Sequence, residues 1–164
     1  MAGSDLAPRV LDTCRTKGLM IATAESCTGG MVASSLVDIP GSSDVVDCGF
    51  VTYSNEAKAR MLGVPMDLIT QHGAVSDLVA RAMAEGALAN SRADLAVAIT
   101  GVAGPGGGTV EKPEGLVHFA AAQKGGNMTA ERIEYGALGR SEVRRRSMEQ
   151  ALRMLFELAE GSTS

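Results

Sequence analysis

Two hydroxyl side chains, Ser26 and Thr28, lie in the motif TAESCTGG at residues 23–30. The apolar run 19–22 precedes this motif and the apolar-periodic segment 31–37 follows it, so we expect a strand that turns sharply into a helix. Such a turn carries free backbone N–H groups and the positive end of the helix dipole. A serine there can act as a nucleophile, with nearby amides stabilising an oxyanion. The alternative, which the local sequence favours, is that Ser26 or Thr28 simply caps the helix.

A serine nucleophile needs a base, and the two histidines of the chain are poor candidates. His118 lies inside an apolar strand pattern and looks structural, while His72 stands beside a glycine and suits a loop hydrogen bond. A lysine is the next candidate, because burial or a neighbouring cation lowers its pKa. Lys58 follows Tyr53 closely, and Tyr53 could relay a proton or position the pair. The alternative for Lys58 is a solvated side chain on an exposed helix face.

Rival chemistries are weaker. Cys27 is a second candidate nucleophile, although only the helix N-terminus would favour its thiolate. The G-x-S-x-G elbow fails because Ala24 stands where its first glycine should be. The glycine-rich segment 104–109 lacks the lysine of a phosphate-binding loop and precedes a strand. No spacing of histidines or cysteines suggests a metal site.

The elements that must position these residues follow from periodicity and chain breakers. We expect apolar strands at 19–24, 45–53 and 95–100, and a hairpin at 115–122 and 128–135. We expect helices at 5–17, after Thr28, at 55–62, from Ser76 onward and at 141–160, with one further turn at 67–70. This pattern predicts an α/β fold, a three-layer α/β/α arrangement around a mixed, mostly parallel sheet, in one domain over residues 1–164. The loop 101–109 follows the carboxyl end of a strand, where open α/β sheets bind ligands.

Composition limits the partners. The net charge is −4 and aromatic residues make up 3% of the chain, which argues against a nucleic-acid binder. No apolar run has the length of a membrane span, and the N-terminus shows no signal core. Three unpaired cysteines fit reduced thiols. We therefore expect a cytoplasmic protein without nucleic-acid or membrane partners.

Several arginines surround the start of the last expected helix, among them Arg140 and Arg144. Cations are unfavourable at a helix N-terminus. One or two of these arginines would offset that cost by holding an anion such as a phosphate.

Taken together, the motifs closely resemble those of the CinA C-terminal domain family. The resemblance runs from about residue 6 to 158 and rests on long, ordered segments: AESCTGG at 24–30, VDIPGSS at 37–43, YSNEAK at 53–58, HGAVS at 72–76, and TGVAGPGGGT at 100–109 with EKP at 111–113. One departure is visible at 138–140, where the sequence is Leu-Gly-Arg and the family usually has Gly-Asp-Arg.

The resemblance implies a nicotinamide-nucleotide amidohydrolase in its stand-alone form. Such enzymes hydrolyse nicotinamide mononucleotide to nicotinic acid mononucleotide and ammonia, and they need no metal or cofactor. The family is also named for competence and DNA damage. Two alternatives therefore stay open: a pyridine-nucleotide-binding module without catalysis, and a protein associated with competence or DNA damage. We also expect a homo-oligomer, which is common for α/β enzymes of this size.

The resemblance also assigns roles to residues. Ser26 would attack the carboxamide carbon and Lys58 would take its proton, while Tyr53 and Thr100 would orient these groups. The amides around Thr28, Gly29 and Gly30 would hold the oxyanion. The ribose phosphate is expected among the following groups: Ser42, Ser43, the glycine loop with Gly101 and Gly104, and Arg140 or Arg144.

Overall fold

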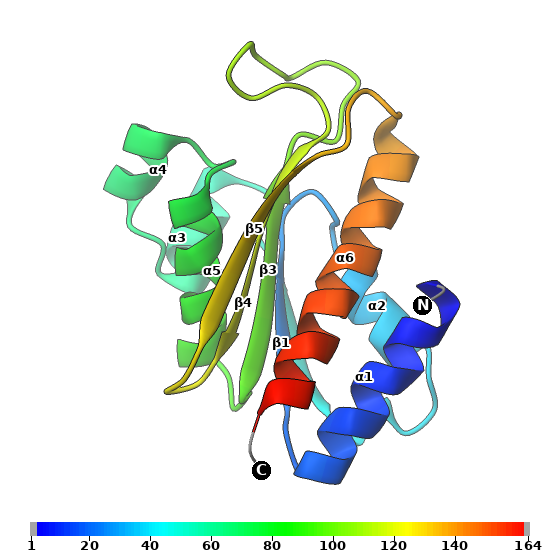
Figure 1. Cartoon of the computed structure of the whole chain (residues 1–164). Coiled ribbons are helices and arrows are strands. Elements are labelled where there is room, and N and C mark those ends of the chain that lie inside the picture. Colours follow the sequence, from blue (N-terminus) through cyan, green and yellow to red (C-terminus); the bar gives the residue numbers. More distant parts are fainter. Residues whose placement is uncertain (1–2, 163–164) are drawn as a thin grey trace.

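The computed structural model describes residues 3–162 and contains a five-stranded mixed sheet between two layers of helices (Figure 1). The strand order is β2-β1-β3-β4-β5. The strands are β1 (Ile21–Glu25), β2 (Val46–Val51), β3 (Leu95–Gly101), β4 (Leu116–Gln123) and β5 (Met128–Glu134). β1 pairs in parallel with β2 and β3, whereas β4 is antiparallel to β3 and β5, so four of the five strands share one direction. The expected α/β class with a mixed, mostly parallel sheet is confirmed.

Helices cover both faces of this sheet. The helices are α1 (Gly3–Lys17), α2 (Met31–Val37), α3 (Asn55–Leu62), α4 (Met66–His72), α5 (Asp77–Ala89) and α6 (Arg140–Gly161), with a 3-10 turn η1 (Ser42–Asp44) before β2. Figure 1 shows α1, α2 and α6 on one face and α3, α4 and α5 on the other. Among the described helices, none is long and apolar enough to cross a membrane.

The two faces of the sheet differ in side-chain size. Val97, Ile99 and Phe119 point into the core under α1 and α6. Alternate positions on the same strands, such as Ala96 and Ala98, point toward α5. Since successive side chains of a strand face opposite sides, this alternation separates a bulky layer from an alanine layer. The small side chains allow α5 to lie close to the sheet.

The helix α3 matches its predicted bounds because both ends are coded locally. The Ser54 hydroxyl accepts a hydrogen bond from the Ala57 N–H at 3.0 Å, which is an N-cap. Gly63 ends the helix with a φ of 68°, the left-handed conformation that glycine adopts without strain. Helix α4 is longer than the single expected turn at 67–70. The predicted strand 19–24 begins two residues later and ends one residue later in the structure, and the predicted strand 45–53 is one residue shorter at its start and two at its end.

The connections create a crevice at the carboxyl ends of β1 and β3. From β1 the chain crosses through α2 on one face to reach β2. From β2 it crosses through α3, α4 and α5 on the opposite face to reach β3, on the other side of β1. Ligands of open α/β sheets bind where the connections diverge in this way. The motif at 23–30 lies at this point.

Candidate active site

Ser26 and Lys58 meet in the structure although they lie 32 positions apart in the chain. The Lys58 Nζ lies 3.0 Å from the Ser26 Oγ. A second hydrogen bond of Lys58, to the backbone oxygen of Thr52, measures 2.8 Å. Lys58 is only 1% exposed and Ser26 8%. Burial is the main cause that lowers the pKa of Lys58 below its ordinary value, because a buried ammonium loses its hydration.

Each partner is placed by a different element. Ser26 follows the last residue of β1, and its N–H donates to the Ile99 oxygen of β3 at 3.0 Å, which extends the parallel pairing by one step. Lys58 is on α3, which begins immediately after the loop that leaves β2. The backbone oxygen of Thr52, at the end of β2, orients the Lys58 amine. Three adjacent strand ends and one helix therefore fix the pair.

A cleft of about 380 Å³ opens beside the pair. Its walls come from segments far apart in sequence: residues 26–27, the start of α3 with Asn55, residues 74–75, the segment 100–107 and Arg140. The cleft reaches the Ser26–Lys58 pair at one end and the glycine-rich loop at the other. We call it the Ser26 cleft.

Tyr53 and Arg140 join the two rims of this cleft. Arg140 donates one hydrogen bond to the Tyr53 hydroxyl and another to the Gly104 oxygen at 3.0 Å. The Tyr53 side chain is 60% exposed, so it lies at the mouth of the cleft. Thr100 is also at the cleft, and its hydroxyl donates to the Ala74 oxygen at 2.9 Å, which anchors the wall at 74–75.

The expected oxyanion donors Gly29 and Gly30 are not available. The Gly29 N–H donates to the Ser26 oxygen at 3.0 Å, and the Gly30 N–H donates to the Glu25 carboxylate at 3.2 Å. Both glycines line a different hollow, beside α2. For Gly30 the reason is the buried Glu25, whose carboxylate occupies the helix N-terminus that the sequence interpretation left open for a ligand. The N–H groups of Cys27 and Thr28 take no part in these bonds.

Ser42 and Ser43 lie at the wrong end of the sheet to contact a ligand in the Ser26 cleft. They belong to η1, which leads into the first residue of β2, and β2 begins opposite Ile21 at the start of β1. A crossover helix between parallel strands returns the chain to the edge where the strands begin. The structure therefore does not bring Ser42 and Ser43 to the Ser26 cleft, and their predicted substrate role stays a prediction.

Arg144 does not line the Ser26 cleft either. Its guanidinium donates to the Cys27 oxygen at 3.0 Å and to the Thr28 oxygen at 3.1 Å. Arg144 thus makes a backbone contact that ties α6 to the turn after β1, and its predicted phosphate contact stays a prediction. In the glycine-rich loop, the Gly106 N–H is not free to bind a ligand, because it donates a hydrogen bond to the Glu114 carboxylate at 2.6 Å.

The rival nucleophile and bases are placed less favourably. Cys27 touches the cleft but is 5% exposed, and burial raises the pKa of its thiol to about 11. The thiol is therefore protonated near neutral pH, the unreactive form. Neither His72 nor His118 is among the residues that line the cleft. His118 pairs with Thr100 in the strand register, and burial lowers the pKa of its imidazole.

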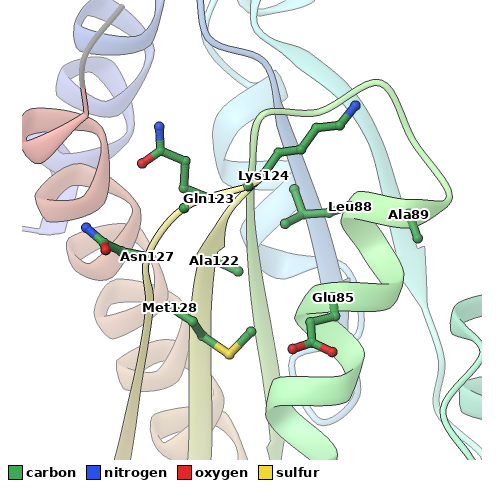
Figure 2. Close-up of a pocket in the computed structure, with 10 residues that line it drawn as sticks. Glu85, Leu88, Ala89, Ala122, Gln123, Lys124, Asn127 and Met128 are labelled. Carbon is green, nitrogen blue, oxygen red and sulfur yellow. The ribbon is translucent and has the colours of Figure 1, made fainter.

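Another hollow, of about 310 Å³, lies at the opposite edge of the sheet. Figure 2 shows Glu85, Leu88 and Ala89 of α5 on one side, and Met128 of β5 with the turn at Lys124 on the other. It holds no nucleophile next to a base. Across residues 3–162, no three side chains of the His, Cys, Asp and Glu types cluster as a metal site would require.

The sequence interpretation missed Glu25 and Asn55. Glu25 directly precedes Ser26 and lies a few residues ahead of a helix, a placement that suits a carboxylate cap. Asn55 lies three residues before Lys58 and lines the cleft. Its position in the motif YSNEAK is the only sequence signal that points to it.

The chain matches the family model described as the CinA C-terminal domain over residues 3–159. Nicotinamide-nucleotide amidohydrolase PncC of Escherichia coli K12 is 49% identical over 153 residues, which cover 93% of this chain and 92% of that protein. A CinA-like protein of Akkermansia muciniphila is 47% identical over 156 residues, which cover 95% of this chain and 37% of that protein. The chain spans 26% to 37% of the length of such longer relatives.

Solved structures show the same fold. The competence/damage inducible protein CihA from Agrobacterium tumefaciens superposes with a TM-score of 0.94 at 52% identity, covering 95% of this chain and 94% of that chain. A CinA superfamily protein from Klebsiella pneumoniae gives a TM-score of 0.92 at 33% identity, covering 99% of this chain and 100% of that chain.

Proposed function

The chain belongs to the CinA C-terminal domain family, and we propose that it is a nicotinamide-nucleotide amidohydrolase acting on nicotinamide mononucleotide. The relative that carries this activity in its name is similar over nearly its whole length. The observation that supports the proposal most is the 3.0 Å contact between the Ser26 Oγ and the Lys58 Nζ beside a cleft. A buried hydroxyl paired with a buried amine is the arrangement of an activated nucleophile.

In this proposal the Ser26 Oγ attacks the carboxamide carbon of the substrate. Neutral Lys58 takes the hydroxyl proton as the new C–O bond forms, and the carbonyl oxygen becomes an oxyanion. We assign the oxyanion to the N–H group of Cys27, which lines the cleft, since the amides of Gly29 and Gly30 are already bonded. The residue after a nucleophile commonly supplies such a donor.

The tetrahedral intermediate then breaks its C–N bond. Lys58 returns the proton to the leaving nitrogen, which departs as ammonia, and the nicotinoyl group stays esterified to Ser26. Water attacks this ester while Lys58 again accepts a proton; Lys58 passes that proton to the Ser26 Oγ as the ester C–O bond breaks, and nicotinic acid mononucleotide is released. Both half-reactions need Lys58 in its neutral form, which its burial favours.

The rest of the cleft suits the nucleotide part of the substrate. Arg140 is the guanidinium at the mouth of the cleft and is our candidate for the phosphate. Tyr53 and Thr100 remain candidates for orienting the reacting groups, and Gly101 and Gly104 line the wall where the ribose would lie. No step in this sequence calls for a metal or cofactor.

The proposal is tested by incubating the purified chain with nicotinamide mononucleotide. We expect ammonia and nicotinic acid mononucleotide in equal amounts, and no release from the Ser26→Ala variant prepared in the same way. Tight binding by calorimetry with no turnover at any pH would favour a nucleotide-binding module. A salt-dependent affinity for DNA would support a role in competence or DNA damage, against the net charge of −4.

We further propose that the protein works as a homo-oligomer in the cytoplasm. Its three cysteines are free thiols, as in proteins of reducing compartments. Closed symmetric assemblies are the usual form of oligomeric enzymes. Light scattering should give a mass that is a multiple of the 16.9 kDa chain, and a mass of one chain would contradict the oligomer.

A further inference from the structure

Glu25 is a fully buried acidic residue that the proposed mechanism does not use. It ends β1, directly before Ser26, and its side chain is 0% exposed. Its two oxygens accept five hydrogen bonds, from Thr28 Oγ1 at 2.7 Å, Val32 N–H at 2.9 Å, Ala33 N–H at 3.1 Å, Gly30 N–H at 3.2 Å and Thr23 Oγ1 at 3.3 Å. Both oxygens act as acceptors only, which is the bonding pattern of a carboxylate.

Three of these bonds replace the missing cap of α2. The residue that precedes this helix is Gly30, which has no side chain to cap it. The first N–H groups of a helix lack partners within the helix, and leaving them buried without partners is costly. The Glu25 carboxylate satisfies them and complements the positive end of the helix dipole. It therefore ties the first turn of α2 to the end of β1, across the turn that carries Ser26.

The same turn is held from its other side. Arg144 of α6 binds the backbone oxygens of Cys27 and Thr28. A carboxylate thus takes N–H groups at the far end of the turn, while a guanidinium takes C=O groups next to Ser26. The turn that carries Ser26 is therefore bonded on one side by a carboxylate and on the other by a guanidinium.

We propose that Glu25 is a positioning residue for the Ser26 hydroxyl, an inference that rests on the proposed amidohydrolase function. Glu25 does not line the cleft, so it acts through the turn and not on the substrate. Misplacement of a reacting group by about 1 Å can cost about 100-fold in rate. Loss of the Glu25 clamp should therefore lower kcat more than it changes KM.

The test compares Glu25→Gln with wild type in steady-state turnover of nicotinamide mononucleotide. Glutamine has the same shape, but its NH2 group cannot accept a hydrogen bond, so one side of the clamp is lost. We expect kcat to fall about 100-fold and KM to change less than about threefold, at a temperature where circular dichroism shows both proteins folded. Glu25→Asp, which keeps the charge on a shorter arm, should recover part of kcat.

Lys17→Met is the matched control for stability. Lys17 binds three carbonyl oxygens at the C-terminal end of α6, at 2.7 to 2.8 Å, far from the site. Its loss should lower the melting temperature and leave kcat unchanged. A Glu25→Gln variant with wild-type kcat per folded molecule, like this control, would overturn the inference while leaving the proposed function intact.

Two further outcomes are decisive. If Glu25→Gln does not fold, Thr28→Val removes one bond of the clamp without removing its charge, and kcat should then fall about tenfold, the value of one hydrogen bond to a charged group. An unchanged kcat in Thr28→Val would overturn the inference. Absence of turnover in wild type would instead refute the proposed function, and the inference with it.

Discussion

Lys58 shows how burial converts an ordinary side chain into a candidate base. A lysine in solvent is protonated near neutral pH and cannot accept a proton. In the structure Lys58 is 1% exposed, and burial lowers the pKa of its amine. The Ser26 hydroxyl and the Thr52 oxygen then receive the hydrogen bonds that water would otherwise accept.

Replacing this amine should abolish turnover without abolishing binding. We expect Lys58→Met to lower kcat about 1000-fold or more, as loss of a general base does. In wild type, kcat/KM should rise with pH as Lys58 loses its proton and level off at a pH below the ordinary lysine pKa. Ammonia release measured across pH checks both statements, with the exposed Lys124→Met as control. A rate unchanged in Lys58→Met would make Lys58 a structural residue.

The lowered pKa of Lys58 also predicts how the free energy of unfolding changes with pH. The pKa of Lys58 is lower in the folded than in the unfolded chain, so between these two values the unfolded chain holds more protons. The free energy of unfolding should therefore rise with pH in this window, and Lys58→Met should lack that part of the rise. Urea unfolding of both proteins at a series of pH values measures the difference. Identical pH slopes would contradict a lowered pKa of Lys58.

At the scale of elements, the contact between α3 and α5 decides where Lys58 lies. A Cβ added at Gly86 of α5 would lie 1.9 Å from the backbone oxygen of Leu62 in α3. Gly86 thus allows the two helices to touch. The alanine layer beneath α5 in turn brings this pair of helices onto the sheet.

We expect Gly86→Ala to destabilise the protein by about 2 kcal/mol through overpacking, although alanine favours a helix by about 1 kcal/mol over glycine. Because α3 must move, kcat should fall as well. Gly161→Ala is the matched control, since a Cβ there meets nothing within 4 Å. Urea unfolding and turnover of both variants check this. A Gly86→Ala variant as stable and active as Gly161→Ala would contradict the close contact.

The elements also show what the sequence could and could not predict. The bounds of α3 were predictable because Ser54 and Gly63 code its two ends locally. The pairing of Ser26 with Lys58 was predictable from their residue types together with the family resemblance. Where Ser42 and Ser43 lie relative to the cleft depends on which end of the sheet a crossover reaches. Such long-range geometry leaves no local signal.

Charged groups that bond within the protein explain why other expected ligand groups do not reach the cleft. A free helix N-terminus looked available to a substrate anion, yet Glu25 already occupies it. Arg144 looked available to a phosphate, yet it binds two backbone oxygens. In both cases the protein supplies the counter-group itself. Only the folded arrangement shows which charged side chains reach the cleft, and of the two candidate arginines Arg140 lines it while Arg144 does not.

At the scale of the whole molecule, the cleft joins elements from both helical layers. Its walls include residues before α3 on one face and Arg140 of α6 on the other. A ligand that fills it should therefore stabilise the folded chain as a unit.

Stabilisation of the folded chain by a bound ligand can be measured with Ser26→Ala, which should bind nicotinamide mononucleotide without hydrolysing it. At a ligand concentration of 100 Kd the stabilisation is about 2.7 kcal/mol, which corresponds to a rise in melting temperature of about 5 to 10 °C for a chain of this size. At the same molar concentration, nicotinamide riboside, which lacks the phosphate, should bind more weakly and give a smaller shift. Equal shifts for the two ligands would contradict a phosphate contact at Arg140.

The most direct test of the central claim, that the hydroxyl of Ser26 is the nucleophile, is the rate of ammonia release by Ser26→Ala and Cys27→Ala in parallel. We predict that Cys27→Ala keeps a rate close to that of wild type, since its buried thiol is protonated. Ser26→Ala should lose about 1000-fold or more, as other hydrolases do without their serine. An active Ser26→Ala together with an inactive Cys27→Ala would transfer the nucleophile to the neighbouring residue and contradict the account.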